Sequence, residues 1–281
     1  MKKRTALFWM LAILITLSAA LFQRMTGPTN PKQVRFTLNG NEYRSKMPRS
    51  ITNTGNFCNF KFSIKELPDE VVAQFFMRKY RSDEEWIQLP VARTGDRFSV
   101  QLPAAPAAAK IEYYVSLETN AGTVLRQAQR PEGEKIVMRY KDSVPATLLI
   151  PHILLMFTAM LLSNLAGLLA FFRRERYMGY AKIAFACLLL GGLVLGCFVQ
   201  KVAFGHYWTG FPLGNDMTDN KTLFVFLFWL IALIANWKSG KRPVLVGLAA
   251  VFMLLVFCIP HSLGGSEYDY KTEKVINSEA L

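Results

Sequence analysis

The residues that enzymes most often use for catalytic and metal sites are scarce in this chain. Its 281 residues include three histidines and four cysteines. No Walker loop, G-x-S-x-G elbow, H-E-x-x-H pair, C-x-x-C pair or dinucleotide fingerprint is present, which excludes the enzyme classes that those motifs define. The sequence therefore favours a protein without catalytic activity.

Charged residues are missing from the longest apolar stretches. Five apolar runs stand out, and the last four contain no Asp, Glu, Lys or Arg: 6–22, 146–172, 183–199, 222–237 and 244–259. A helix that crosses a bilayer needs about 20 apolar residues, and flanking aromatic and basic residues extend the shorter runs into the interface. We expect a four-helix transmembrane bundle over 144–262, with helices at 144–172, 180–200, 221–237 and 243–260.

Basic residues next to these runs predict one orientation. They precede the first run and lie around the links between runs two and three and between runs four and five: Lys2, Lys3, Arg4, Arg173, Arg174, Arg176, Lys182, Lys238, Lys241 and Arg242. Because basic residues stay on the cytoplasmic side, the N-terminus is predicted to be cytoplasmic. Residues 23–143, the link 205–222 and the tail 263–281 are then predicted to be extracytoplasmic.

The first run has two interpretations. Its basic start, short apolar core and small residues at Ser18, Ala19 and Ala20 are typical of a cleaved secretory signal. The alternative is a transmembrane anchor over 1–22. We expect the segment to be retained, which gives five membrane helices, whereas cleavage would leave four.

The exported segment 23–143 has the pattern of β structure. Apolar residues alternate with polar ones over 34–38 and again over 58–64, and Asn39-Gly40 predicts a tight turn between strands. Further strands are expected in six stretches: 71–80, 86–92, 97–102, 111–117, 122–126 and 136–140. Short strands at this spacing predict an immunoglobulin- or fibronectin-III-like sandwich. The chain is thus expected to be an α+β membrane protein.

Charge and cysteine content limit what the exported segment does. It carries 19 Lys or Arg and 13 Asp or Glu, a net charge of +6, without a nucleic-acid-binding motif. Nucleic acid is therefore excluded as a partner, and a solvated basic surface is expected. Cys58 is its one cysteine, so it has no internal disulfide. Cys58, Cys187, Cys197 and Cys258 are expected to be small apolar fillers.

The three histidines are predicted to reach the same membrane face. His152 opens the second run, His206 follows the third and His261 follows the fifth. Carboxylates and a thioether are close in sequence: Asp216, Asp219, Glu267, Asp269 and Met156. Imidazole and carboxylate at one level are typical of Zn, Cu or Fe ligands, thioether favours copper, and two histidines can hold haem. The alternatives are core filling by Met156 and polar groups at the bilayer boundary.

The link "GHYWTGFPLGNDMTDNKT" has more features than a connector needs. Tyr207, Trp208 and Phe211 are expected in the outer interface. Gly210 and Gly214 permit positive φ, as a shaped loop would need. The link ends in four N-cap residue types, Asp216, Thr218, Asp219 and Asn220, directly before the fourth run. Since one cap suffices, we expect at least one spare acid to face outward.

Several stretches resemble one group of proteins. They are "TGPTNP", "YRSKMPRS", "RKYRSDEEWIQLPV", "AKIEYYVSL", "PHILLMF", "YWTGFPLGNDMTDNKT" and "IPHSLGGSEYDY". With them the chain resembles an uncharacterised family of bacterial inner-membrane proteins, found in Bacteroidota among others. The resemblance implies an exported immunoglobulin- or fibronectin-like domain, a C-terminal helical bundle and an inner-membrane location. It implies no activity.

Three functional hypotheses follow. The first is a non-catalytic subunit or scaffold whose β-sandwich binds other envelope proteins while the helices contact the lipid bilayer. The second is a metal- or haem-binding redox protein with the three histidines at its site. The third is a small transporter, for which the polar residues Ser163, Asn164 and Asn236 are available inside the runs. Asn164 is expected to bond a neighbouring helix rather than a substrate. The first hypothesis is preferred.

Overall fold

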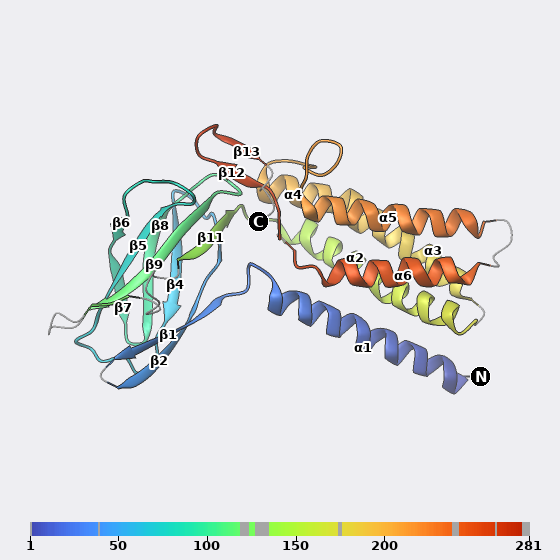
Figure 1. Ribbon diagram of the computed structural model, residues 1–281, viewed down its shortest axis with the longest axis horizontal. Coiled ribbons are helices and arrows are strands. Elements are labelled where there is room, and N and C mark those ends of the chain that lie inside the picture. The colour runs from blue at the N-terminus through green and yellow to red at the C-terminus, as the bar shows by residue number, and fades with distance from the viewer. Residues whose placement is uncertain are drawn as a thin grey trace. The chain divides into compact units, whose positions relative to one another are not determined.

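Helices and strands separate into two units along the chain. The computed structural model describes residues 2–38, 40–118, 124–126, 135–173, 176–237, 242–261 and 263–276. Unit 1 comprises the chain up to Pro28 together with Val144–Ser266, and unit 2 comprises Thr29–Ser143 together with Glu267–Ile276. The protein is therefore α+β, with the helices in unit 1 and the sheets in unit 2 (Figure 1).

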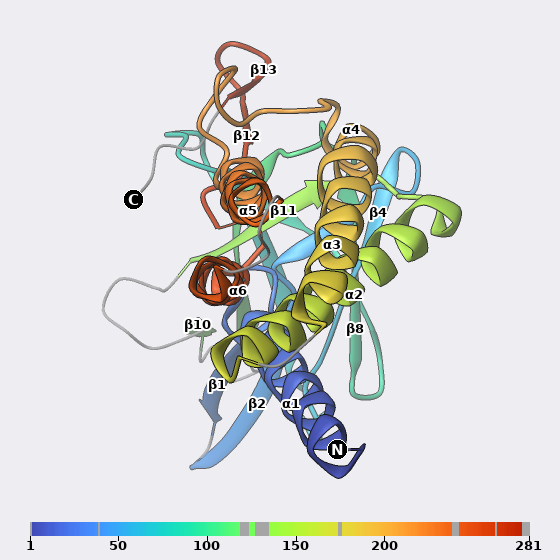
Figure 2. The ribbon, with the colours of Figure 1, turned by 90° about the vertical axis from the view of Figure 1, so that its right-hand side faces the viewer.

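Unit 1 is a bundle of apolar helices that run lengthwise beside one another (Figures 1 and 2). Its elements are α1 Lys2–Thr26, α2 Ala146–Phe171, α3 Tyr177–Leu188, η1 Leu189–Leu195, α4 Gly196–Phe204, α5 Met217–Ala235 and α6 Pro243–Cys258. Four described helices are long and apolar enough to cross a membrane: Ala6–Thr26, Ala146–Phe171, Tyr177–Phe204 and Met217–Ala235. Helix α6 is apolar but shorter.

The N-terminal helix α1 is packed into this bundle. Phe8 and Ala12 are buried in a cluster with three leucines of α2, namely Leu162, Leu165 and Leu169. Between the same two helices, the Asn164 amide of α2 donates a 2.9 Å hydrogen bond to the Thr16 hydroxyl of α1. The expectation that Asn164 bonds a neighbouring helix is thus confirmed, and α1 contributes both apolar and polar contacts.

Small residues set the distance between α2 and its neighbours. A Cβ on Gly167 would lie 2.5 Å from the Ala250 Cβ of α6. The third run contains the π-helical segment η1 in mid-helix, where Gly191 and Gly192 are buried against α2. A Cβ on Gly191 would lie 2.8 Å from the Leu155 Cβ. The π-helical segment η1 was not predicted from the sequence. The one local indication of it is the glycine pair within an otherwise bulky apolar helix.

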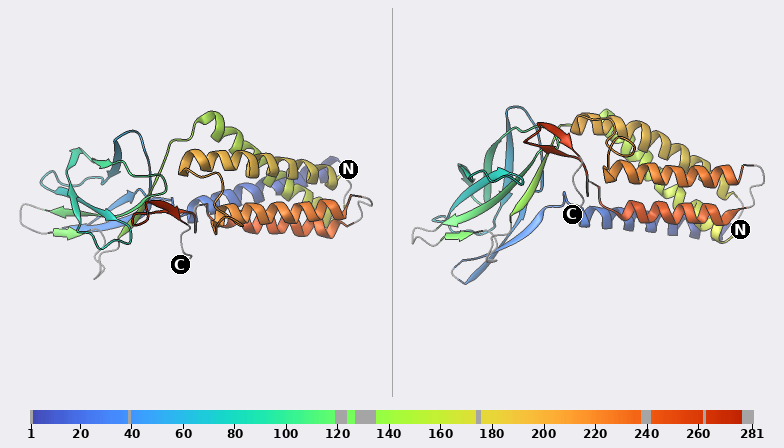
Figure 3. Two further views of the ribbon diagram at one scale, coloured as in Figure 1. Left: turned by 90° about the horizontal axis from the view of Figure 1, so that it is seen from above. Right: turned by 45° about the horizontal axis from the view of Figure 1, so that its top comes forward.

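Several helices of unit 1 begin or end at the same end of the bundle. The start of α1, the end of α2 and the starts of α3 and α6 lie at one end of the bundle, together with the end of α5 (Figures 1 and 3). Arg173, Arg176 and Arg242 flank these helix ends in the sequence. The basic links predicted to share one side thus lie at one end of the bundle.

Unit 2 is built from two sheets and two separate hairpins. Its strands are β1 Lys32–Leu38, β2 Asn41–Met47, β3 Ser50–Thr52, β4 Phe57–Ser63, β5 Val72–Lys79, β6 Ile87–Leu89, β7 Val91–Thr94, β8 Arg97–Pro103, β9 Lys110–Glu118, β10 Val124–Arg126, β11 Ile136–Lys141, β12 Glu267–Asp269 and β13 Lys274–Ile276. One sheet has the order β3-β11-β9-β5-β6, with β10 also on β9, and the other has the order β4-β8-β7. Only the β3–β11 pair is parallel among the described pairs.

Alternating side chains of the two sheets form one apolar core. Phe60 of β4 contacts Phe75 of β5 and Tyr113 of β9, with ring centroids 5.0 and 5.1 Å apart. Cys58, on the same face of β4, is fully buried, as expected for an apolar filler. The buried faces of β4 and β5 follow the period of two that the sequence displays. The strands expected over 34–38, 58–64 and 71–80 are confirmed.

Two features of unit 2 differ from the expectation. The stretch 86–92, expected as one strand, is divided at Pro90 into β6 and β7, which pair with β5 and β8 in different sheets. Proline has no amide hydrogen for a sheet ladder, so the chain changes sheets there. The polar strand β2 was also missed; it pairs with β1 across the predicted Asn39-Gly40 turn, and Gly40 has φ of +79°.

The C-terminal segment adds a hairpin to unit 2. Its strands β12 and β13 pair with each other, and the Tyr268 amide donates to the Ala108 carbonyl at 3.1 Å. The Tyr270 hydroxyl donates to the Lys110 carbonyl, and burial raises the pKa of Tyr270 to about 12. Lys110 also pairs with Glu267 in a partly buried salt bridge. The described part of the stretch predicted as a tail, residues 267–276, is therefore folded as part of the β unit.

Candidate functional site

The three histidines do not come together as a metal site. In α2, the His152 Nδ1 lies 2.8 Å from the Gly191 carbonyl of η1, so Nδ1 carries the hydrogen and donates it. His206 and His261 are exposed in the segments that follow α4 and α6. Among the described residues, no group of three or more His, Cys, Asp or Glu is close enough to hold a metal ion. The geometry gives the metal and haem hypotheses no support.

The thioether proposed as a copper ligand has a packing role. Met156 lies one turn after His152 on α2 and is partly buried against the bundle core. A Cβ on Gly191 would lie 3.2 Å from the Met156 Sδ, and a Cβ on Gly192 would lie 3.5 Å from it. The sulfur therefore fills the space that the two glycines leave open, which agrees with the core-filling interpretation.

The link 205–222 is a folded polar structure that surrounds the start of α5. We call Gln200, Thr209, Asp216, Asp219 and Ser266 the cap network. Asp216 is the N-cap residue of α5 and accepts from the backbone amides of Thr218 at 2.7 Å and Asp219 at 3.3 Å. Its other oxygen accepts from the amide and the hydroxyl of Ser266, at 2.7 and 2.8 Å. Asp216 thereby connects the helix start to the segment after α6.

The second carboxylate of the cap network is also buried. One oxygen of Asp219 accepts from the Thr209 amide at 2.6 Å, the Thr209 hydroxyl at 3.2 Å and the Gln200 amide at 3.0 Å. The hydroxyl oxygens of Ser266 and Thr209 lie 2.8 Å apart, which brings the two halves of the network together. Asp219 is 5% exposed. The prediction of a spare outward-facing acid was therefore wrong, because distant polar groups surround this carboxylate.

Close packing explains the glycine in this link. A Cβ on Gly210 would lie 2.6 Å from the Asp219 Cβ and 2.8 Å from the Asn220 Oδ1. The expectation of positive φ at Gly210 and Gly214 was wrong; the link and the segment after α6 use Gly205 and Gly264 for that conformation. Gly210 is needed for space, because the loop backbone lies directly against α5.

A buried lysine completes this end of the bundle. Lys221, 8% exposed, donates to the carbonyls of Ile259 at 2.9 Å and Pro260 at 3.3 Å. The Gln23 amide of α1 donates to the Phe257 carbonyl at 2.8 Å. These donors satisfy carbonyls that the end of α6 leaves without a helical partner. This role of Lys221 was not predicted from the sequence.

The cap network is chemically closed. Donor groups contact both oxygens of Asp216 and one oxygen of Asp219, and none of the described ion pairs involves either carboxylate. A metal ion would have to displace amide donors from Asp216 and Asp219, and a general base needs a lone pair open to its substrate. The arrangement therefore stabilises the loop and joins three helix ends.

The remaining predicted residues lie in local contacts. Tyr207 and Phe211 are exposed, as expected of an interface, and the Trp208 indole donates to the Phe211 carbonyl at 3.0 Å. Glu267 is engaged with Lys110 inside unit 2. Asp269 accepts from the Thr272 hydroxyl and the Lys271 amide, which together lower the pKa of its carboxyl group. Neither acid is part of the cap network.

The polar residues considered for transport are separated. Asn164 bonds Thr16 between two helices, and Asn236 bonds the Ala232 carbonyl and the Arg242 backbone at the end of α5. Ser163 is fully buried in α2, and its hydroxyl has no hydrogen-bond partner among the described residues. Asn164 and Asn236 therefore make hydrogen bonds at two separate places in the bundle.

An aromatic and basic cluster on unit 2 escaped the sequence analysis. Side chains on the sheet face opposite the core are stacked: Phe76 with Tyr114 at 4.8 Å, Trp86 against Tyr114 at 4.8 Å, and the Arg78 guanidinium over Trp86 at 4.8 Å. All four are half-buried. We call them the aromatic patch. Its signal was the alternation of β5 and β9, which places Phe76 and Tyr114 on the face that should be polar.

Comparison with known proteins does not identify a family for this chain. No family model matches the chain, and neither a curated protein nor a solved structure matches it. The function must therefore be argued from the two units themselves.

Proposed function

We propose that the protein is an integral inner-membrane protein whose β unit is an extracytoplasmic interaction module of an envelope complex. Four membrane-length helices support insertion in the bilayer. The basic links at one end of the bundle support a cytoplasmic location for that end. With that orientation, the topology predicted from the basic links puts unit 2 on the extracytoplasmic side.

The aromatic patch is the observation that carries the interaction role. Trp, Tyr and Arg are the side chains that contribute most to binding energy in protein interfaces. Here Trp86, Tyr114 and Arg78 form one half-buried cluster on a rigid sheet. Arg78 is held by Glu112 at 2.8 Å, so the guanidinium is already ordered before a partner binds. The partner is another envelope protein.

Retention of the first helix belongs to this proposal. Removal of α1 would expose the α2 leucines that pack on Phe8 and would leave the Asn164 amide without the Thr16 hydroxyl. It would also take Gln23 from the end of α6. The intact mass of the protein isolated from membranes should therefore include residues 1–22.

Photo-crosslinking in intact cells tests the interaction role. A photoreactive amino acid at Gln88, which pairs with Phe76 in the sheet register, should give a discrete crosslinked protein. Trp86→Ala should abolish that product. The matched control is Phe57→Ala, which removes an exposed aromatic ring from the other sheet and should leave the product unchanged. A product that persists in Trp86→Ala would refute the role of the aromatic patch.

Reporter fusions test the topology independently. A fusion at Ser239 should read cytoplasmic and a fusion after Ser266 should read exported. The opposite pair of readings would refute the orientation, whatever the crosslinking shows.

A further inference from the structure

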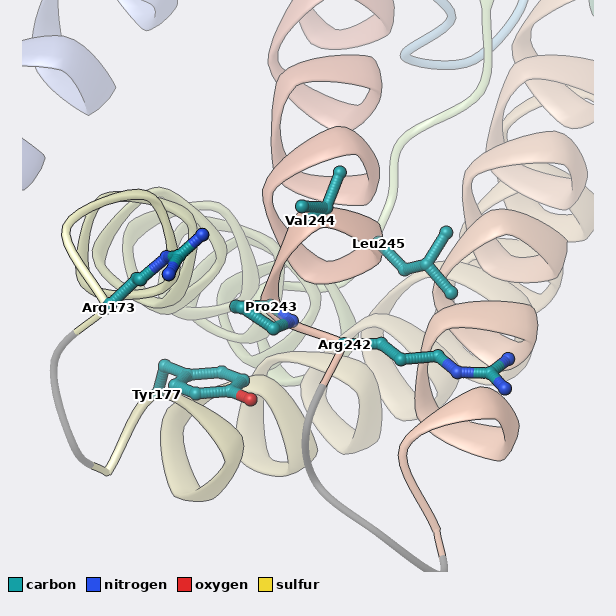
Figure 4. A pocket seen from close by; sticks show the side chains of 6 residues that line it. All are labelled: Arg173, Tyr177, Arg242, Pro243, Val244 and Leu245. Atoms are coloured by element: carbon teal, nitrogen blue, oxygen red, sulfur yellow. The ribbon is translucent and has the colours of Figure 1, made fainter.

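A depression of about 770 Å³ lies at the end of the bundle where α2 ends and α3 and α6 begin. It is lined by Arg173, Tyr177, Arg242, Pro243, Val244 and Leu245 (Figure 4). Arg173 and Tyr177 come from the neighbouring ends of α2 and α3, and the other four residues come from the start of α6, which is distant in the sequence. The volume is in the range of sites for small ligands, and it is part of neither the cap network nor the aromatic patch.

The charge at this depression is uncompensated within the described part of unit 1. Arg173 and Arg242 are exposed, and neither takes part in a described ion pair. The carboxylates described in unit 1 are Asp216 and Asp219, which begin α5 at the other end of the bundle (Figure 1). Two guanidinium groups therefore stand beside the depression without a described acid nearby, which favours an anionic ligand.

The two arginines border the depression rather than form one clamp. Their guanidinium groups lie on opposite sides of Pro243: the Arg173 side chain extends toward Pro243, the Arg242 side chain extends away from it, and the Tyr177 ring lies beside Pro243 (Figure 4). Each guanidinium offers its own fork of donors for a phosphate oxygen pair. A headgroup that rests over Pro243 would thus meet a cation on either side.

An apolar stripe continues from the depression along α6. Val244 is 69% exposed, and the exposed residues that follow it at helical spacing are Leu248, Val251 and Leu255. Positions three and four apart share one face of a helix. The stripe therefore offers a hydrocarbon chain a path that starts where the arginines would hold a phosphate. A free phosphate ion has no apolar group that could contact this stripe.

We propose that this depression binds the phosphodiester headgroup of an anionic phospholipid, with an acyl chain along the Val244–Leu255 stripe of α6. Anionic lipids are enriched in the cytoplasmic leaflet, and basic pockets between membrane helices on that side hold their headgroups. The inference rests on the membrane insertion and orientation proposed above. It adds a specific lipid site to a surface that would otherwise contact the bilayer only generally.

Native mass spectrometry of the full chain in neutral detergent tests the site. Phosphatidylglycerol should bind as a discrete adduct, and phosphatidylcholine should bind at least tenfold more weakly. The double variant Arg173→Gln/Arg242→Gln should lose at least tenfold in affinity for phosphatidylglycerol. The matched control Lys182→Gln/Lys201→Gln removes the same charge from exposed positions outside the depression and should bind as the unaltered chain does.

Each other result overturns the proposal. Equal binding of phosphatidylcholine, or an equal loss in the lysine control, would mean general adhesion of lipid. Competition by millimolar inorganic phosphate would identify a free-anion site. If lipid binding fails while the Ser239 fusion still reads cytoplasmic, the lipid site alone is refuted; a Ser239 fusion that reads exported refutes the orientation on which it rests.

Discussion

The two units of this protein handle apolar and charged groups in opposite ways. Unit 1 exposes large apolar side chains along almost every helix, among them Leu14, Ile150, Phe224, Ile231 and Leu255. Unit 2 exposes few, namely Phe57, Val72 and Ile87. An apolar surface of this extent is unfavourable in water and favourable in lipid. The contrast indicates that the units are built for different solvents.

Ion pairs show the same contrast. All described ion pairs lie in unit 2, for example Lys79 with Glu84 and Arg78 with Glu112. In unit 1, the carboxylates of Asp216 and Asp219 accept hydrogen bonds from neutral amides and hydroxyls. A charged group in an apolar surrounding is costly unless it is paired or hydrogen-bonded. Unit 1 meets that cost with hydrogen bonds from neutral groups, and unit 2 with ion pairs.

The largest effect on stability is expected from a substitution in the core of unit 2, and it tests whether the two units unfold separately. Phe60→Ala removes a ring that contacts Phe75 and Tyr113 in the centre of unit 2, and should cost about 3–5 kcal/mol of unit 2 stability. Hydrogen exchange of the full chain should show the loss in β4, β5 and β9 and leave the amides of α2 unchanged. Equal loss in α2 would show that the units unfold together and would break the comparison.

A control on the same strand isolates burial as the cause. Phe57 belongs to β4 but faces away from the core and is 62% exposed. Phe57→Ala should change the stability of unit 2 by less than about 0.5 kcal/mol.

A smaller effect tests the hydrogen-bonded carboxylates of unit 1. Asp219→Ala leaves the Thr209 amide and the Gln200 side chain without their acceptor, at a cost of about 1–3 kcal/mol. Thermal unfolding in detergent should show a lower midpoint, and exchange should rise across the link between α4 and α5. The exposed Asn215→Ala, in the same link, should leave both unchanged. A midpoint unaffected by Asp219→Ala would mean that the cap network does not stabilise unit 1.

The smallest effect concerns the contact between α1 and α2. Thr16→Val keeps the side-chain shape but removes the acceptor of the Asn164 amide. Hydrogen bonds between membrane helices contribute about 0.6 kcal/mol on average, so the thermal midpoint should fall slightly. Thr26→Val, which alters an exposed hydroxyl at the end of the same helix, should have no effect. An equal response to both variants would argue against an interhelical role for Thr16.

Local patterns were sufficient for most elements. Uncharged apolar runs predicted the helices, and alternation predicted β4, β5, β8, β9 and β11, because both patterns depend on residues a few positions apart. Elements with weak local signals were missed. The strand β2 reads "NEYRSKM", and the tail strands β12 and β13 have three residues each. β2 pairs with the adjacent β1, and β12 pairs with β13, whose hairpin is held on unit 2 by contacts with Ala108 and Lys110.

The sequence predicted where the candidate site lies, but not which groups its carboxylates and histidines contact. The link 205–222 was correctly identified as a shaped loop, and Asp216 as one of its N-cap candidates. The burial of Asp219 could not be predicted from the sequence. Its hydrogen-bond donors, Thr209 and Gln200, lie earlier in the chain, and only the folded loop brings them to the carboxylate. Likewise, equal depth of the three histidines at helix ends does not make them neighbours, since helices in a bundle are separated sideways.

The sequence by itself determined the element type of each unit: apolar runs without charge gave the helices of one unit, and period-two alternation gave the strands of the other. Only the tertiary structure decided which polar groups meet. Ser266 reaches Asp216 across 50 positions, and Lys221 reaches the end of α6 across 38. Hydrophobic patterning is local and additive along a chain, whereas a hydrogen bond needs two groups within about 3 Å. Where such groups are far apart in sequence, only folding brings them together.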